Sequence, residues 1–105
     1  AMIMQPDAVS EELIQPSILE ASRKKPLPAA TRLRFDRFGE GMAAQVLYTG
    51  PYSAEGPTIE RLHGFIADAG YRPSGKHHEI YLSDPSRAEP AKLRTIIRQP
   101  VAAAP

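Results

Sequence analysis

The hydrophobic pattern of this chain changes period at Pro57. Beyond that proline, side chains of one stripe recur at three- and four-residue spacing: Ile59, Leu62, His63, Ile66 and Ala69. This is the spacing of one face of an α-helix. Pro57 suits the first helical position, and Gly70 suits the residue after the last turn. The sequence therefore predicts an amphipathic helix over 57–69, with His63 packed in the core.

Strand-like segments lie on both sides of this helix. They cover residues 2–6, 31–38, 42–50, 76–83 and 95–101. The glycines at 39 and 41 predict a hairpin between 31–38 and 42–50. An earlier helix begins after Ser10 and ends in Arg23-Lys24-Lys25; Pro16 either kinks it or marks the start of its regular part. Strands before and after each helix predict an α+β fold.

A length of 105 residues predicts one domain. Within it we expect a strand, a helix and a stiff linker (Pro26-Leu27-Pro28) over 2–30. A core of hairpin, helix and strands follows over 31–101, and residues 102–105 form a frayed tail.

Composition excludes several classes of function. The formal net charge is +1, so electrostatics indicate neither a nucleic-acid partner nor a membrane partner. The absence of cysteine excludes disulfides and thiolate metal sites. No apolar stretch approaches the roughly 20 residues of a spanning helix, and there is no signal-peptide pattern. We therefore expect a cytoplasmic protein. We also expect no cofactor, because no nucleotide-binding or catalytic motif of the common kinds is present.

The strand at 76–83 carries the most chemically interesting residues. Alternation places His78, Ile80 and Leu82 on one face, and His77, Glu79 and Tyr81 on the other. The aliphatic pair is expected to meet the helix, which leaves Glu79 on the open side. A carboxylate beside rings can bind a cation, and partial burial would raise its pKa toward a range useful for acid–base chemistry. The alternative is a solvated strand face. Adjacent histidines in a strand cannot meet at one metal ion, so no metal site is predicted.

Four segments together resemble a known family. In chain order they are Leu47-Tyr48-Thr49-Gly50-Pro51-Tyr52, then 58–66, then Gly75-Lys76-His77-His78-Glu79-Ile80-Tyr81-Leu82 continuing to Pro85, and finally 92–101. Their order and spacing closely resemble the C-terminal half of GyrI-like proteins, bacterial relatives of multidrug-binding effector domains.

The resemblance implies a function and a site. Members bind small molecules in a cleft between two strand-helix-strand-strand repeats, where a glutamate meets cationic aromatic compounds; Glu79 falls at that position. His77, Tyr81 and Tyr48 would surround it, and Tyr52 and Phe65 would line the wall. Some members resemble hydrolases that open cyclopropane-containing electrophiles, in which case Glu79 would be the acid–base group. Tyr48 or Tyr81 would then stabilise the oxyanion. A gyrase-interacting inhibitor is a third alternative.

The chain departs from the family in length. Family members have two repeats and this sequence has one, so half of the cleft is missing. We expect a second copy to cover the exposed surface and to complete the cleft as a homodimer. The alternative is that the sequence is a fragment of a longer protein.

Overall fold

The computed structural model describes residues 1–25 and 28–105, which form two compact units, Ala1–Phe38 and Gly39–Pro105. The first unit contains helix α1 (Glu11–Lys24) and a 3-10 helix, η1 (Pro28–Arg32). Pro16 lies inside α1, which extends a turn and more to either side of it. None of the residues of α1 is buried. Part of the predicted linker, residues 26 and 27, lies outside the described residues.

The two strands predicted at 2–6 and 31–38 are absent, and these predictions were wrong. Residues 2–6 form no regular structure, and the segment from Leu33 to Phe38 is irregular after η1 ends. Leu33 and Phe38 are exposed, at 59% and 60%. A strand needs a neighbour for its N–H and C=O groups. Strand-like composition alone therefore did not produce a hairpin here.

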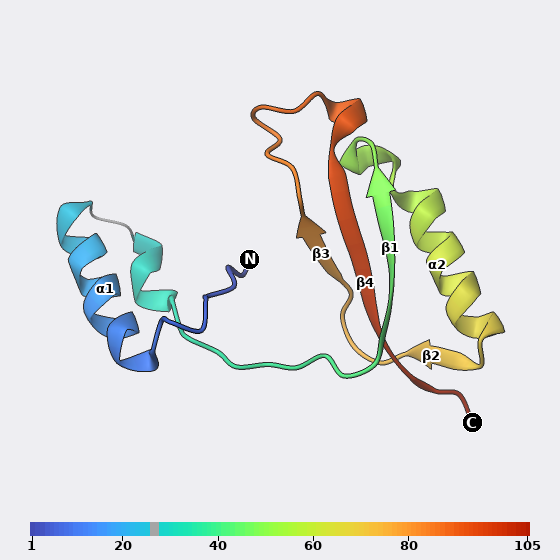
Figure 1. Cartoon of the computed structure of the whole chain (residues 1–105), viewed down its shortest axis with the longest axis horizontal. Helices are drawn as coiled ribbons and strands as arrows, with labels where there is room; N and C mark the ends of the chain where they lie inside the picture. The colour runs from blue at the N-terminus through green and yellow to red at the C-terminus, as the bar shows by residue number, and fades with distance from the viewer. Residues whose placement is uncertain (26–27) are drawn as a thin grey trace. The chain divides into compact units, whose positions relative to one another are not determined.

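The second unit is an α+β structure, with the order strand, helix, strand, strand, strand (Figure 1). Its elements are β1 (Ala43–Thr49), η2 (Tyr52–Ala54), α2 (Gly56–Asp68), β2 (Tyr71–Pro73), β3 (His78–Tyr81), η3 (Pro90–Lys92) and β4 (Arg94–Ala103). The predicted helix and the strands at 42–50, 76–83 and 95–101 are confirmed, with small shifts of their ends. Gly70 has a φ of 83°, which allows the chain to turn sharply after α2.

β4 is the central strand of the antiparallel sheet. β1 pairs along one side of it, from Ala43↔Pro100 to Thr49↔Arg94. β3 and β2 share the other side, β3 from His78↔Arg98 to Tyr81↔Thr95 and β2 with residues 101–103. The predicted tail is wrong for Ala102 and Ala103, because both pair with β2.

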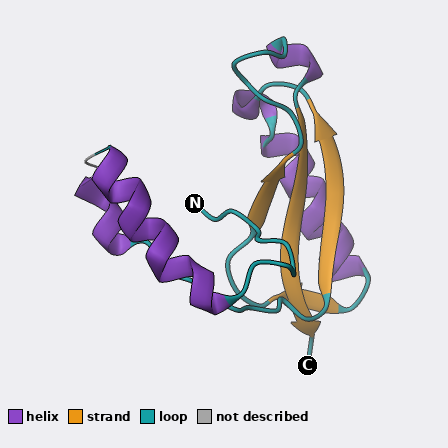
Figure 2. Cartoon of the chain, turned by 60° about the vertical axis from the view of Figure 1, so that its left-hand side comes forward, coloured by secondary structure: helices purple, strands orange, loops and turns teal. Residues whose placement is uncertain are grey.

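Helix α2 packs on one face of this sheet (Figure 2). Leu62 and Ile66 on α2 and Ile97 on β4 form the buried centre, at 5%, 2% and 0% exposure. Burial of side chains of this size stabilises the fold by about 1.5–3 kcal/mol each. His63 is exposed, so the prediction that it packs in the core was wrong. The apolar stripe is narrow, and His63 lies beside it.

The orientation of β3 contradicts the expectation that Ile80 and Leu82 meet the helix and that Glu79 lies on the open side. Glu79 pairs with Ile97 and therefore shares the face that α2 covers, whereas Ile80 pairs with Ile96 on the opposite face. Leu82 is 47% exposed and contributes nothing to the core. The error arose because we assigned the aliphatic residues to the helix. Pairing with β4 decides the face, and it places Glu79 and Tyr81 on the helix side.

Candidate functional site

Glu79 lies on β3 at the edge of the face that carries α2. Its side chain is 23% exposed, so it is largely shielded but still reaches the surface. The segment before β3 is held by Gln99, whose Nε2 donates to the carbonyl oxygen of Gly75 at 2.9 Å. Gln99 is itself 3% exposed. A buried amide on the central strand thus positions the start of the strand that carries Glu79.

One tyrosine bonds to Glu79, and a second packs against the first. The hydroxyl of Tyr81 donates to Glu79 Oε2 at 2.8 Å, since both side chains lie on the same face of β3. The ring of Tyr52 meets that of Tyr81 edge to face, with ring centroids 5.3 Å apart. The hydrogen bond to Glu79, followed by burial and negative charge nearby, raises the pKa of Tyr81 to about 12. Tyr81 therefore keeps its proton near neutral pH and remains a hydrogen-bond donor.

His77 completes the set predicted on this strand. Its Nε2 lies 4.0 Å from Glu79 Oε1, and its side chain is 46% exposed. A protonated His77 would attract the carboxylate. The structure thus brings Glu79 together with His77, Tyr81 and Tyr52.

A second carboxyl group lies at the same place and was missed from the sequence. Glu55 is the residue that precedes α2, and it is only 6% exposed. Its side chain does not cap the helix. It adjoins the carboxyl group of Glu79 instead. An acidic residue just before Pro57 is ordinary for a helix start, and nothing in the sequence connects it with a strand so far along the chain.

The two carboxyl groups shift each other's pKa in opposite directions. Burial, then the hydrogen bond and the charge of Glu79, raise the pKa of Glu55 from 4.5 to about 7. The hydrogen bond from Glu55 is the largest cause that lowers the pKa of Glu79, although burial opposes it; Tyr81 and His77 lower it further. Below about pH 7, Glu79 is the charged member and Glu55 the protonated one.

Tyr48 lies on the same face as the cluster, across the central strand. Tyr48 and Tyr81 both pair with Thr95, from opposite sides. The Tyr48 hydroxyl donates to the carbonyl oxygen of Pro51 at 2.8 Å. Gly50, with a φ of 144°, permits this arrangement, because a Cβ there would lie 2.7 Å from the hydroxyl oxygen.

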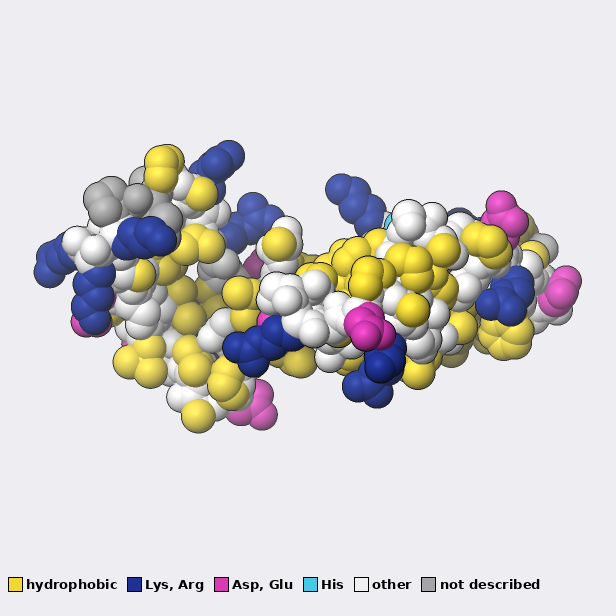
Figure 3. Space-filling model, turned by 90° about the horizontal axis from the view of Figure 1, so that it is seen from above, with side chains coloured by type: hydrophobic (Ala, Val, Ile, Leu, Met, Phe, Trp, Pro, Cys, Tyr) yellow, Lys and Arg dark blue, Asp and Glu magenta, His cyan; other side chains and the backbone are white. Residues whose placement is uncertain are grey.

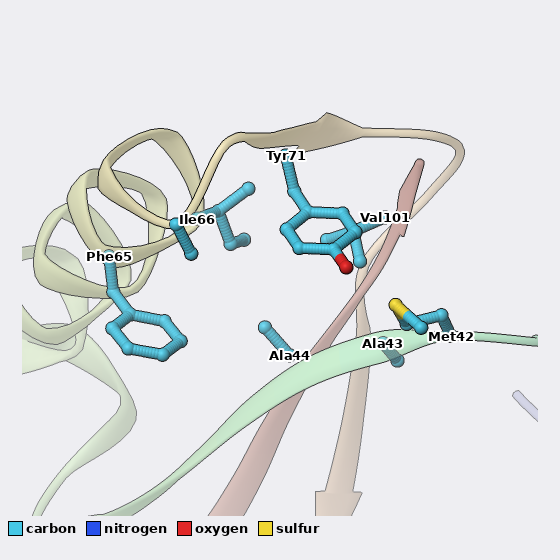
Figure 4. A pocket seen from close by; sticks show the side chains of 8 residues that line it. Met42, Ala43, Ala44, Phe65, Ile66, Tyr71 and Val101 are labelled. Atoms are coloured by element: carbon cyan, nitrogen blue, oxygen red, sulfur yellow. The ribbon is translucent and has the colours of Figure 1, made fainter. Parts of the chain in front are cut away.

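Phe65 is not part of the cluster around Glu79. It is 64% exposed on α2 and lines a hollow of about 190 Å³ with Ala44, Tyr71 and Val101 (Figure 4). It also lines a second hollow of about 230 Å³ beside Gln45 on β1. The first hollow is lined by apolar side chains, whereas the second is lined by polar and apolar side chains of β1 and α2 in equal number; neither includes Glu79.

Comparison with known proteins identifies the family. The model of the GyrI-like small molecule binding domain matches residues 4–102, which is nearly the whole chain. The chain belongs to this GyrI-like family. Among curated proteins none matches it.

Solved structures from Listeria innocua resemble this GyrI-like chain. A hydrolase is 40% identical, with a TM-score of 0.82 over 93% of this chain. An uncharacterized conserved protein is 42% identical, with a TM-score of 0.85 over 93% of this chain. The chain spans about half of their length, 52% and 50%.

None of the helices in the described part of the chain has the length and apolarity needed to cross a membrane.

Proposed function

We propose that this GyrI-like chain binds hydrophobic or cationic aromatic compounds through Glu79. The observation that carries this proposal is the partly exposed Glu79 carboxylate beside the edge-to-face ring pair of Tyr52 and Tyr81. A carboxylate attracts a cation, and electron-rich rings attract its aromatic or alkylated surface. Tyr81 is 58% exposed and Tyr52 38%, so both rings have surface left for a ligand.

A matched pair of probes tests the role of charge. Tetraphenylphosphonium is an aromatic cation, and triphenylphosphine oxide is a neutral compound of related shape. We expect Glu79→Gln to weaken binding of the cation by about tenfold or more, equal to about 1.4 kcal/mol, and to leave binding of the neutral compound unchanged. Glu60→Gln, an exposed glutamate on α2, is the control. Equal affinity of wild type and Glu79→Gln for the cation would refute the carboxylate's role.

A hydrolase is the second candidate, favoured by the similarity to a hydrolase of Listeria innocua at 40% identity. In this proposal Glu79 takes a proton from water, and the water oxygen bonds to a cyclopropane carbon of an electrophilic natural product. The ring C–C bond breaks, and its electrons move to a conjugated carbonyl oxygen. That oxygen accepts a hydrogen bond from tyrosine. Tyr81 is the first choice because it already contacts Glu79, and Tyr48 is the second.

Product analysis tests this candidate. Incubation with a cyclopropane-containing alkylating agent should give the ring-opened, water-added product faster than buffer alone, and Glu79→Gln should abolish the difference. Binding without turnover would leave the first proposal and remove the second.

We further propose that a second copy of the chain supplies the opposite wall of the cleft. Two observations support a homodimer. β1 pairs only with β4 among the described residues, and Phe65 lies exposed at the edge of β1 and α2. Hydrophobic side chains also appear on the surface shown in Figure 3. Sedimentation equilibrium should give twice the mass of one chain, and Phe65→Glu should give the monomer mass; a wild-type monomer would refute this.

A further inference from the structure

The backbone N–H of Glu55 donates to the carbonyl oxygen of Tyr52, the ring of Tyr52 lies against that of Tyr81, and Tyr81 donates to Glu79. This arrangement brings the carboxyl groups of Glu55 and Glu79 beside each other, and a hydrogen bond between two carboxyl groups needs a proton. Carboxylates only accept hydrogen bonds, so one member of such a pair must be protonated. Glu55 is 6% exposed, and its Oε1 is buried without a hydrogen-bond partner among the described residues. Glu79 is more open and accepts from Tyr81 as well. The better-solvated and better-bonded group holds the charge, and Glu55 holds the proton.

We infer that Glu55 is a further residue of the ligand site and that it sets the charge of the ligand the site accepts. When Glu55 is protonated, the pair of Glu55 and Glu79 has one negative charge and binds a monocation. A ligand with two positive charges binds both carboxylates and displaces the proton of Glu55. This rests on the proposed function, namely that a cation binds at Glu79.

Other groups around the pair could also respond to pH. His77 Nε2 lies 4.0 Å from Glu79 Oε1, Tyr81 donates to Glu79, and Tyr52 lies against Tyr81. On α2, Arg61 is engaged with Thr58 through a 3.2 Å hydrogen bond. The central strand contributes only uncharged side chains beside the pair, at positions 95 and 97. His77 is therefore the group from which Glu55 must be distinguished.

Two probes with the same two-ring skeleton separate charge from shape. Methyl viologen is a dication, and 1-methyl-4-phenylpyridinium is a monocation. Calorimetry in buffers of different ionisation enthalpy counts the protons released. For wild type near pH 6, we expect methyl viologen to release close to one proton and its affinity to rise about tenfold per pH unit up to about pH 7. The monocation should show a much smaller pH dependence.

Variants assign the proton. Glu55→Gln, which keeps an N–H donor for Glu79, should abolish proton release by methyl viologen, whereas Glu60→Gln should not change it. His77→Gln should keep the release. Release that survives in Glu55→Gln but disappears in His77→Gln would overturn the inference.

A titration of the free protein tests the inference even if neither probe binds. Failure of both probes would count against the proposed function. With ¹³C-labelled glutamate, one carboxyl carbon should titrate near neutral pH in wild type and be missing in Glu55→Gln. If every glutamate titrates in the ordinary acidic range, Glu55 does not carry the proton and the inference fails.

Discussion

Replacing Glu55 with glutamine should change how the stability of the fold depends on pH. The pKa of Glu55 is raised from 4.5 to about 7 in the folded chain, first by burial and then by Glu79. Between these values the folded state binds more protons than the unfolded state. The free energy of unfolding therefore falls as pH rises through this window. Glutamine has no proton to lose, so this decrease should be absent from the variant.

The size of the effect follows from the shift. At about 1.4 kcal/mol per pKa unit, a rise from 4.5 to about 7 corresponds to about 3 kcal/mol. This is an upper value, because Glu79 shares the hydrogen bond. The pKa of Glu79 is lowered, so its contribution to stability is present above its ordinary pKa and is lost as pH falls. The amide of Gln at position 55 can still donate to Glu79, so the difference between the two proteins isolates Glu55.

Urea unfolding provides the measurement. The sequence has no tryptophan, so far-UV circular dichroism is the suitable signal. At about pH 5 the two proteins should be similar in stability, and at about pH 8.5 Glu55→Gln should be more stable by up to about 3 kcal/mol. Glu60→Gln should follow wild type at both values. A constant difference between Glu55→Gln and wild type across this range would refute a buried, protonated Glu55.

Three further predictions concern the core and the cluster. Leu62→Ala should lower the free energy of unfolding by about 2–5 kcal/mol, because Leu62 is 5% exposed at the centre of the core; Phe65→Ala, at an exposed position of the same helix, should cost far less in urea unfolding. Thr95→Val should leave stability unchanged or raise it by about 1 kcal/mol, because Thr95 Oγ1 is buried without a hydrogen-bond partner among the described residues; a clear loss would show that the hydroxyl is bonded. Glu79→Gln should lower the pKa of Tyr81 from about 12 toward its ordinary value of 10.0, because the bond to Glu79 is the largest cause of its rise, and ultraviolet titration against Tyr81→Phe measures this.

Local signals in the sequence determined helix α2 and three strands of the second unit, β1, β3 and β4, whereas β2 (Tyr71–Pro73) was not predicted. Leu62 and Ile66 recur at helical spacing between Pro57 and Gly70, and the structure has α2 at Gly56–Asp68. Such spacing is a property of the chain itself, because it records which side chains one helix can present together. The cluster of His77, Glu79 and Tyr81 was likewise predictable, because alternation in any strand puts them on one face.

Only the tertiary structure decided which face that is and what else lies there. Alternation alone does not say which face of β3 a helix covers. The pairing of Glu79 with Ile97, which lies under α2, assigns the face of Glu79 to the helix side. Glu55 meets Glu79 only because the fold brings the residue before α2 to the Glu79 side chain, a contact between distant segments that no local pattern encodes. The predicted strand at 31–38 does not form for a related reason. A strand exists only where another strand bonds to it, and the sequence of one segment does not say whether such a partner is present. The spacing of side chains along the chain is a local property, whereas the face that a strand turns to a helix and the strand it pairs with depend on neighbours that the fold brings together.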